Sequence, residues 1–214
     1  MVVGGKTLLF DPFVTANRLA SAVNVDEIEA NYIFVSHAHF DHMTDVLRIA
    51  QRTGAKVLGN WELYLWFNKS DLQNTHPINP GGQYTFDFGT VKCFAAQHSS
   101  SLPDGSYGGV ACGFAFQTAT GSFYYSGDTG LTLDMKLVAE WTKLDFAVLP
   151  VGGGLTMGAE DAIKAARLVG VRKVVGVHYD TFDFIKIDHS KTVEYFSEAG
   201  MSLHMLEIGS IVDL

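Results

Sequence analysis

Charged side chains are scarce in this sequence. Asp, Glu, Lys and Arg make up 18% of its 214 residues and hydrophobic residues 47%, whereas an average domain is about 25% charged. We therefore expect much of the chain to be buried in a core. Basic residues are fewer than acidic ones, 15 against 23, and the net charge is −8. A protein that binds long nucleic acids needs a basic face to displace counterions from the phosphates, so we expect no large nucleic acid as a partner.

Cysteine and long apolar runs are scarce as well. Cys93 and Cys112 each lie inside an apolar segment, which indicates buried thiols rather than a disulfide framework and fits the reducing cytosol. No run approaches the roughly 20 apolar residues of a membrane span, and no signal-peptide pattern is found at the start. These features predict a cytoplasmic protein without a membrane partner.

Short segments rich in β-branched and aromatic residues recur along the chain, which is typical of strands. The predicted strands are 7–10, 32–35, 57–58, 91–95, 110–117, 122–125, 146–149, 174–177 and 205–212. An apolar stripe that starts at Val46 predicts a helix there, and further helices are predicted for the segments 133–141, 159–169 and 190–196. No linker or repeat divides the sequence. We predict one domain, residues 1–214, with an α/β fold in which helices cover the sheets.

Potential metal ligands follow four of the predicted strands, at the point where each strand ends. They are His37 after strand 32–35, His98 after 91–95, Asp128 after 122–125 and His178 after 174–177. Functional sites of α/β proteins collect in the loops at the carboxyl ends of strands. We therefore expect these four side chains to lie close together.

The densest group of such residues is the run His37-Ala38-His39-Phe40-Asp41-His42. In an extended segment His37 and His39 point to the same side, and we expect a helix to begin near Met43. Three imidazoles so close together would repel one another when protonated, whereas a divalent metal would hold them and the carboxylate together. Isolated histidines are more often surface or half-buried residues; this is the interpretation that we give to His76, His189 and His204.

These residues resemble the signature of the metallo-β-lactamase superfamily. The segment Ser36–His42 contains the pattern HxHxDH, and His98, Gly127-Asp128-Thr129 and His178 follow in the expected order. Further segments are similar to a bacterial branch, the UPF0173 metal-dependent hydrolases, which is akin to the ascorbate-6-phosphate lactonase group. They are Gly81-Gly82, His98-Ser99-Ser100, Tyr107-Gly108-Gly109, Ser126–Thr129, Leu149–Gly153 and Thr156–Ala162.

The resemblance implies a four-layer αββα sandwich that holds two divalent ions per chain: Zn, Mn, Fe or Ni. By position, the first ion would be bound by His37, His39 and His98, the second by Asp41, His42 and His178, and Asp128 would bridge both. No cysteine stands at a ligand position, which argues against β-lactamase activity. His39 stands where flavodiiron proteins have Glu, which argues against a redox iron site. Family members usually begin with a strand before the segment that resembles 2–7 here, so we expect the sandwich to lack that strand.

The implied reaction is hydrolysis of a small ester, lactone or amide, with or without a phosphate group. Two metals about 3.5–4 Å apart can share a water and lower its pKa toward neutrality, so we expect a bridging hydroxide as the nucleophile, with Asp41 and Asp128 as the catalytic residues. Asp11, at a strand end before Pro12, is a candidate partner for a ligand histidine and equally an ordinary turn carboxylate. The candidate substrate-binding residues lie in two glycine-containing loops. They are Ser99, Gly153 and Thr156.

Two other functions stay open at this point. One is a phosphodiesterase or nuclease of the same superfamily that acts on a short or cyclic nucleotide. The other is a non-catalytic binding module stabilised by metal, which the number of candidate ligands disfavours because structural zinc sites usually have four ligands and no open position. The sequence determines neither the native metal nor the substrate, and it leaves open whether the chain forms a homo-oligomer.

Overall fold

A computed structural model describes residues 1–70 and 72–214 of the chain. Within these residues the strands form two sheets. The smaller sheet has the order β1-β2-β3-β4-β5, with β1 antiparallel to β2 and the other neighbours parallel. Its strands are β1 (Val2–Val3), β2 (Lys6–Phe10), β3 (Tyr32–Phe34), β4 (Lys56–Gly59) and β5 (Thr75–Pro77).

The larger sheet has the order β12-β11-β10-β9-β8-β7-β6. It is parallel from β9 to β12 and antiparallel from β6 to β9. Its strands are β6 (Gln83–Phe86), β7 (Gly89–Ala95), β8 (Cys112–Thr118), β9 (Gly121–Tyr125), β10 (Phe146–Pro150), β11 (Lys173–Val177) and β12 (Ser202–His204).

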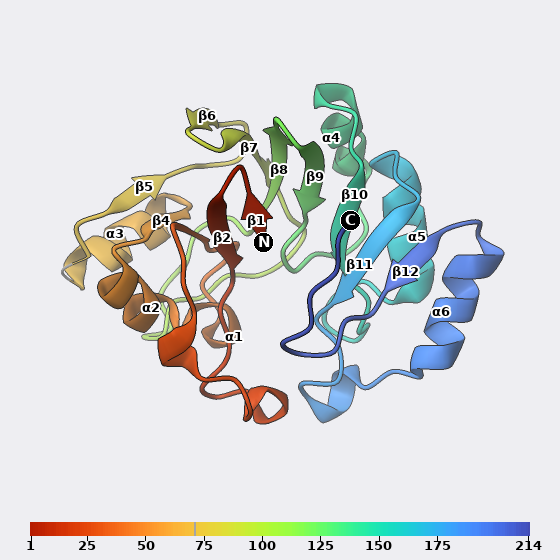
Figure 1. Cartoon of the computed structure of the whole chain (residues 1–214), viewed down its shortest axis with the longest axis horizontal. Coiled ribbons are helices and arrows are strands. Elements are labelled where there is room, and N and C mark those ends of the chain that lie inside the picture. Colours follow the sequence, from red (N-terminus) through yellow and green to blue (C-terminus); the bar gives the residue numbers. More distant parts are fainter. Residues whose placement is uncertain (71) are drawn as a thin grey trace.

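Helices cover the outer face of each sheet, so the molecule has four layers. In Figure 1, α2 and α3 lie to the left beside the smaller sheet, and α5 and α6 lie to the right beside the larger one. The αββα sandwich implied by the family resemblance is confirmed. The helices are α1 (Phe40–Met43), α2 (Val46–Thr53), α3 (Trp61–Lys69), α4 (Lys136–Trp141), α5 (Ala159–Leu168) and α6 (His189–Glu198). In the described part of the chain, no helix has both the length and the apolar composition needed to cross a membrane.

Aromatic rings fill the layer between the two sheets. Phe34 of β3 lies with its ring centroid 5.4 Å from that of Phe114 and 5.0 Å from that of Phe116, both on β8. Because β10 is covered on both faces, all five of its residues are buried, as expected for a central strand. This packing holds the strand ends of both sheets at one edge of the sandwich.

The last predicted strand, 205–212, is wrong. The final strand is instead β12, which pairs in parallel with β11 and ends at His204. Beyond it the chain leaves the sheet, because Leu206 packs against the inter-sheet core and Gly209 turns the backbone with a φ of +86°. Two of the apolar residues that suggested a strand, Ile208 and Ile211, are exposed.

The other predicted strands are present within one or two residues of their expected bounds. Besides β12, three strands and one α-helix of the described residues were not predicted. They are β1, β5, β6 and α3. Helix α3 begins after Asn60, whose side chain accepts a hydrogen bond from Leu63 N. Its apolar residues include the exposed Trp61 and Leu65, so no single apolar stripe marks it in the sequence. The expectation that the sandwich lacks a family strand before β1 stays a prediction.

Candidate metal centre

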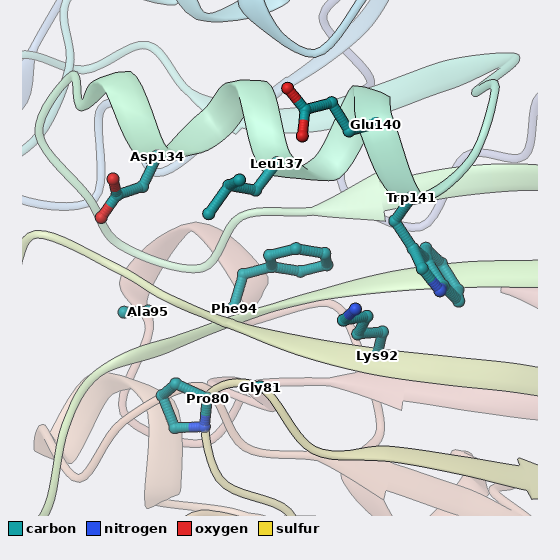
Figure 2. A pocket seen from close by; sticks show the side chains of 9 residues that line it. All are labelled: Pro80, Gly81, Lys92, Phe94, Ala95, Asp134, Leu137, Glu140 and Trp141. Carbon is teal, nitrogen blue, oxygen red and sulfur yellow. The ribbon is translucent and has the colours of Figure 1, made fainter.

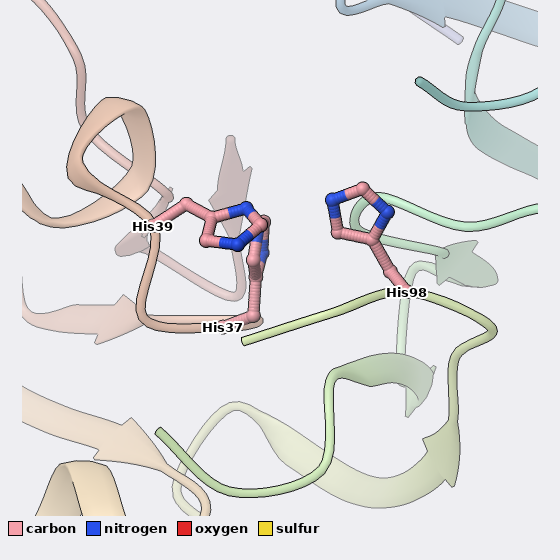
Figure 3. A group of neighbouring side chains, drawn as sticks. All are labelled: His37, His39 and His98. Atoms are coloured by element: carbon pink, nitrogen blue, oxygen red, sulfur yellow. The ribbon is translucent and has the colours of Figure 1, made fainter. Parts of the chain in front are cut away.

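Three imidazoles from two loops meet at the edge of the sandwich. His37 and His39 follow β3, and His98 follows β7. One ring nitrogen of each lies within 4.8 Å of those of the other two. His37 Nε2 and His39 Nδ1 are 2.9 Å apart, and Figure 3 shows His98 facing this pair from the opposite loop. We call these three residues the first ligand group.

A second group lies beside it and consists of Asp41, His42 and His178, whose ligand atoms also lie within 4.8 Å of one another. Asp41 Oδ2 is 3.5 Å from His42 Nε2 and 3.6 Å from His178 Nε2. The helix α1 that carries Asp41 and His42 begins at Phe40, three residues before the predicted start at Met43. His39 keeps an extended conformation with a ψ of 150°, so the helix begins directly after it.

Asp128 lies between the two groups. Its Oδ2 is 2.9 Å from Nε2 of His178 and 3.5 Å from Nε2 of both His42 and His98. The prediction that residues after β3, β7, β9 and β11 would lie close together is confirmed. One carboxylate oxygen thus contacts imidazoles of both groups.

The structure offers a direct test of whether these residues fit a metal ion. His42 Nε2 is buried and has no hydrogen-bond partner among the described residues, although it lies 3.5 Å from oxygens of Asp41 and Asp128. A buried polar atom without a partner is costly, and a divalent ion between these groups would satisfy it. Imidazole nitrogens and carboxylate oxygens are the donors that Zn, Mn, Fe and Ni accept. The residues therefore fit such an ion.

The first ligand group is electrostatically prepared to bind a cation. Burial lowers the pKa of His37 well below its usual value, and the neighbouring imidazole of His42 lowers it further. Burial likewise lowers the pKa values of His39 and His98. Only the neutral imidazole has a lone pair for a metal, so this group offers free lone pairs at neutral pH.

The second group differs in its protonation. Burial lowers the pKa of His178, but hydrogen bonds to Asp128 and Asp41 outweigh it and raise the pKa to about 9. Burial also lowers the pKa of His42, but the carboxylates of Asp11, Asp128 and Asp41 together outweigh it and raise the pKa well above the usual value. The pKa values of Asp41 and Asp128 are lowered, against the effect of burial, by the nearby imidazoles of His178 and His42. A metal entering this group must displace protons from its imidazoles.

Asp11 lies directly behind His42. Its Oδ2 is 2.9 Å from His42 Nδ1 and accepts hydrogen bonds from Ser36 Oγ at 2.5 Å and from Tyr125 OH at 2.6 Å. Its Oδ1 accepts a hydrogen bond from Ser36 N at 2.7 Å. The backbone of Asp11 has a φ of +42°, a strained value for a residue other than glycine. This arrangement suits a carboxylate that orients a ligand histidine; the role of Asp11 toward a metal stays a prediction.

Comparison with known proteins agrees with this geometry. A family model described as the beta-lactamase superfamily domain matches residues 6–179. A UPF0173 metal-dependent hydrolase of Methylacidiphilum infernorum is 46% identical over 206 residues, which cover 96% of this chain and 91% of the relative. One of Flavobacterium johnsoniae is 44% identical over 99% of this chain and 94% of its own length. This chain belongs to the UPF0173 metal-dependent hydrolases.

A solved structure supports the assignment. Igni18, described as a novel metallo hydrolase from Ignicoccus hospitalis, matches this UPF0173 protein with a TM-score of 0.88 and 31% identity over 98% of this chain and 91% of that one. The protein is therefore a metal-dependent hydrolase of the metallo-β-lactamase superfamily. The resemblance that the HxHxDH run and the later His and Asp residues indicated is confirmed.

Three features of the UPF0173 site were not predicted from the sequence. Tyr125 donates to Asp11 from β9, and Ser36 contacts both Asp11 and His37, whose Nδ1 lies 3.0 Å from Ser36 Oγ. Ser36 stands in the family motif, but nothing in the sequence singles out Tyr125 among the apolar residues of its strand. Ser100 is a third: its Oγ accepts from Ala38 N at 3.1 Å and donates to Gly108 O at 2.9 Å, which fastens the loop 99–109 to the first ligand group.

The three candidate substrate residues have different surroundings. Ser99 Oγ lies 3.4 Å from Nε2 of His39, on the side of the ring away from His37. Gly153 has a φ of +67° and donates its N–H to Met157 O at 3.0 Å. The Thr156 hydroxyl is buried, and no described residue offers it a hydrogen-bond partner. Their roles toward a substrate stay predictions.

The glycine run has a structural role at Gly152. A Cβ atom there would lie 2.1 Å from the carbonyl oxygen of His178, so glycine allows the two backbones to touch. His76, His189 and His204 lie outside the two ligand groups, as expected. His76 is in β5, His189 Nε2 lies 2.5 Å from Asp180 Oδ2, and His204 ends β12.

Two cavities lie outside the ligand groups. One, of about 600 Å³, is on the outer side of the larger sheet, where Phe94 of β7 faces Leu137 and Trp141 of α4 (Figure 2). Its described lining residues include no imidazole and no group of potential metal ligands, so we do not assign the reaction to it. The other, of about 430 Å³, is lined by the loops that follow β2 and β11, through Ala16, Arg18, Thr181, Phe182, Asp183 and Phe184.

Proposed function

We propose that this protein uses two divalent metal ions to hydrolyse a small ester, lactone or amide, with or without a phosphate group. One ion would be held by His37, His39 and His98 and the other by Asp41, His42 and His178, with Asp128 shared. The observation that carries the proposal is the position of Asp128 Oδ2, within 3.5 Å of one imidazole of the first group and two of the second. A carboxylate oxygen so placed is suited to be a ligand of both ions.

Bound ions of this kind lower the pKa of a water molecule toward neutrality and polarise the substrate oxygen. The residues of the chain complete the site. Asp41 is 13% exposed, against 6% for Asp128 and 4% for Asp11, so it is the carboxylate most open to water. Its oxygens can accept a hydrogen bond from the attacking water and orient it toward the substrate. Asp11 holds the ring of His42 in position from behind.

The partners that we propose follow from charge and access. A small molecule suits the acidic chain, whose net charge is −8, better than a long nucleic acid does. The side chains of His98 and His178 are partly exposed, which favours an open catalytic site over a closed structural one. Cys93 and Cys112 are buried and free, which fits the reducing cytosol that we propose as the location.

The test starts from protein stripped with EDTA and reloaded with Zn²⁺, Mn²⁺, Fe²⁺ or Ni²⁺. We expect elemental analysis to find two ions per chain, and we expect hydrolysis of at least one lactone, ester or amide from a panel that also contains phosphodiesters and cyclic nucleotides. Activity should disappear with EDTA and return with metal. A maximum of one ion would contradict the dinuclear site.

The panel also separates the two alternatives. Turnover of phosphodiesters alone would identify a phosphodiesterase of the same superfamily. Two bound ions without turnover of any compound, in a protein whose melting temperature depends on the metal, would instead favour a metal-stabilised binding module.

A further inference from the structure

Four phenylalanines form a continuous row of rings beside the candidate metal centre. They are Phe13, Phe40, Phe182 and Phe184, and we call them the phenylalanine wall. The ring centroids of Phe13 and Phe40 are 5.7 Å apart, those of Phe40 and Phe182 6.0 Å, and those of Phe182 and Phe184 5.5 Å. Phe40 is 59% exposed and Phe184 62%, so this apolar surface faces solvent.

The wall borders the metal centre because the same segments supply both. Phe40 stands between His39 and Asp41 in the sequence, and Phe182 follows His178 by four residues. Consecutive Cα atoms are about 3.8 Å apart, so the Cα atoms of Phe182 and His178 are at most about 15 Å apart. In Figure 1 the loops after β2 and β11 lie side by side at the lower edge of the molecule, as the cavity that they line together also requires.

Hydrogen bonds fix the loop that carries Phe13. The buried carboxylate of Asp45 accepts from Val14 N at 2.6 Å, from Thr15 N at 3.0 Å and from Thr15 Oγ1 at 2.6 Å. A ring on a loop held in this way can bind a ligand without a large loss of conformational entropy.

The loop that carries Phe182 and Phe184 is held in a similar manner. Asp180 Oδ1 accepts from Ile187 N at 3.1 Å, and Asp180 Oδ2 lies 2.5 Å from His189 Nε2. Both sides of the wall are therefore preorganised.

We infer that the phenylalanine wall binds a planar apolar group of the substrate, so that the substrates are aryl or arylalkyl esters, lactones or amides. This inference rests on the proposed function. The adjoining cavity of about 430 Å³ has the volume of a small-molecule site. Arg18 and Asp183 both line it, and their opposite charges do not favour an ionic occupant. Offset or edge-to-face contacts between a substrate ring and the phenylalanines of the wall would add to the binding energy that comes from burying apolar area.

A second copy of the chain is a less suitable occupant. A stable protein interface buries about 800 Å² on each partner, whereas four partly exposed phenylalanines offer a few hundred Å². A substrate ring needs only part of that area.

The test measures binding rather than turnover. Hydroxamates chelate metal ions through their head group. Acetohydroxamate carries no ring, whereas benzohydroxamate and 3-phenylpropionohydroxamate place a phenyl ring at a shorter and a longer distance from the metal. We expect calorimetry with the metal-loaded protein to show at least one aryl compound binding tenfold or more tighter than acetohydroxamate. Phe184→Ala should reduce this advantage at least fivefold and leave acetohydroxamate unchanged within twofold. Phe184→Leu, which keeps apolar area, should restore part of it.

Trp61→Ala is the matched control, because Trp61 is an exposed aromatic residue on α3 outside the wall; both classes of ligand should bind it as they bind the unmutated protein. If acetohydroxamate binds and the aryl compounds bind no tighter, or if Phe184→Ala has no selective effect, the inference is wrong while the metal centre stands. If no hydroxamate binds although metal is loaded, the proposed function fails and the inference with it. A dimer in sedimentation that Phe184→Ala dissociates would identify the wall as a self-association surface and overturn the inference.

Discussion

The hydroxyl of Tyr125 donates a hydrogen bond of 2.6 Å to Asp11 Oδ2 and thereby joins the two sheets at the metal centre. Tyr125 is the last residue of β9 in the larger sheet, and Asp11 follows β2 in the smaller one. Burial raises the pKa of Tyr125 well above its usual value, and the charge of Asp11 raises it further, so the phenol keeps its proton. The orientation of His42 in front of Asp11 therefore depends on how the two sheets pack.

Replacing Asp11 by Asn should weaken metal binding. We expect Asp11→Asn to lower the affinity of the second ligand group about 10–100-fold, the range for partners of ligand histidines, because an amide orients His42 Nδ1 less strongly. Competition with a coloured chelator measures this. The control is Asp87→Asn. Asp87 accepts a hydrogen bond from Tyr32 OH at 2.7 Å and forms an ion pair with Lys6, but it lies outside the two ligand groups. Equal metal affinities in the two variants would remove the positioning role of Asp11.

The members of the two candidate ligand groups could be found from the sequence because their signal is local. The run from His37 to His42 is contiguous, and His98, Asp128 and His178 each follow a recognisable strand by a few residues. The partners of these ligands could not be predicted in the same way. Tyr125 lies 114 residues from Asp11 and contacts it only because β2 and β9 face each other.

The errors in the predicted fold have the same origin. The apolar pattern after Met205 resembles a strand, but none of the described strands pairs with it. Strand β12 ends at His204, and the chain then turns away and packs Leu206 on the inter-sheet core. Helix α3 was not predicted because its apolar residues include the exposed Trp61 and Leu65, so they do not form a single stripe. Pairing and exposure are tertiary properties, and a single sequence carries little information on them.

Asp128→Asn should abolish most of the activity. The substitution keeps the shape of the side chain but removes the charge of the oxygen that lies within 3.5 Å of His42, His98 and His178. We expect turnover to fall on the order of 100-fold or more, because loss of a shared ligand exceeds the effect of losing an outer partner. Metal content after gel filtration should fall as well. His204→Ala, on an edge strand outside the ligand groups, should retain activity within about twofold; similar losses in both variants would contradict the assignment of Asp128.

Gly152→Ala should disturb His178 through the backbone. The added Cβ would lie 2.1 Å from the carbonyl oxygen of His178, a distance that requires the backbone to shift. We expect the free energy of unfolding to fall by about 1–3 kcal/mol, as for other overpacked positions, and metal affinity to fall with it. At Gly130 a Cβ would lie 3.7 Å from the nearest atom, so Gly130→Ala is the control and should change stability by less than about 0.5 kcal/mol. Chemical denaturation with and without metal provides both values, and unchanged stability in Gly152→Ala would show that the loop relaxes freely.

The stability of the metal-free protein should fall as the pH rises through the weakly alkaline range. The pKa of His178 is about 9 in the folded protein and about 6.5 in an unfolded chain. Protonation of His178 therefore stabilises the fold fully below about pH 6.5, and this contribution is lost as the pH rises toward 9. His42, whose pKa is also raised, acts in the same direction. The lowered pKa values of His37, His39 and His98 affect stability only below about pH 6.5, since above it these residues are neutral in both states.

Bound metal should reverse this trend, because it displaces the protons that His178 and His42 hold at neutral pH. The metal affinity should rise up to tenfold per pH unit for each proton released, and the stabilisation by metal should rise with it. We expect the melting temperature in EDTA to fall from pH 6.5 to 8.5, while the difference between samples with Zn²⁺ and with EDTA grows over the same interval. His178→Gln removes one of the titrating groups and should flatten both dependences. A melting temperature in EDTA that rises between pH 6.5 and 8.5 would show that the carboxylates of Asp41 and Asp128 do not hold His178 in its protonated form.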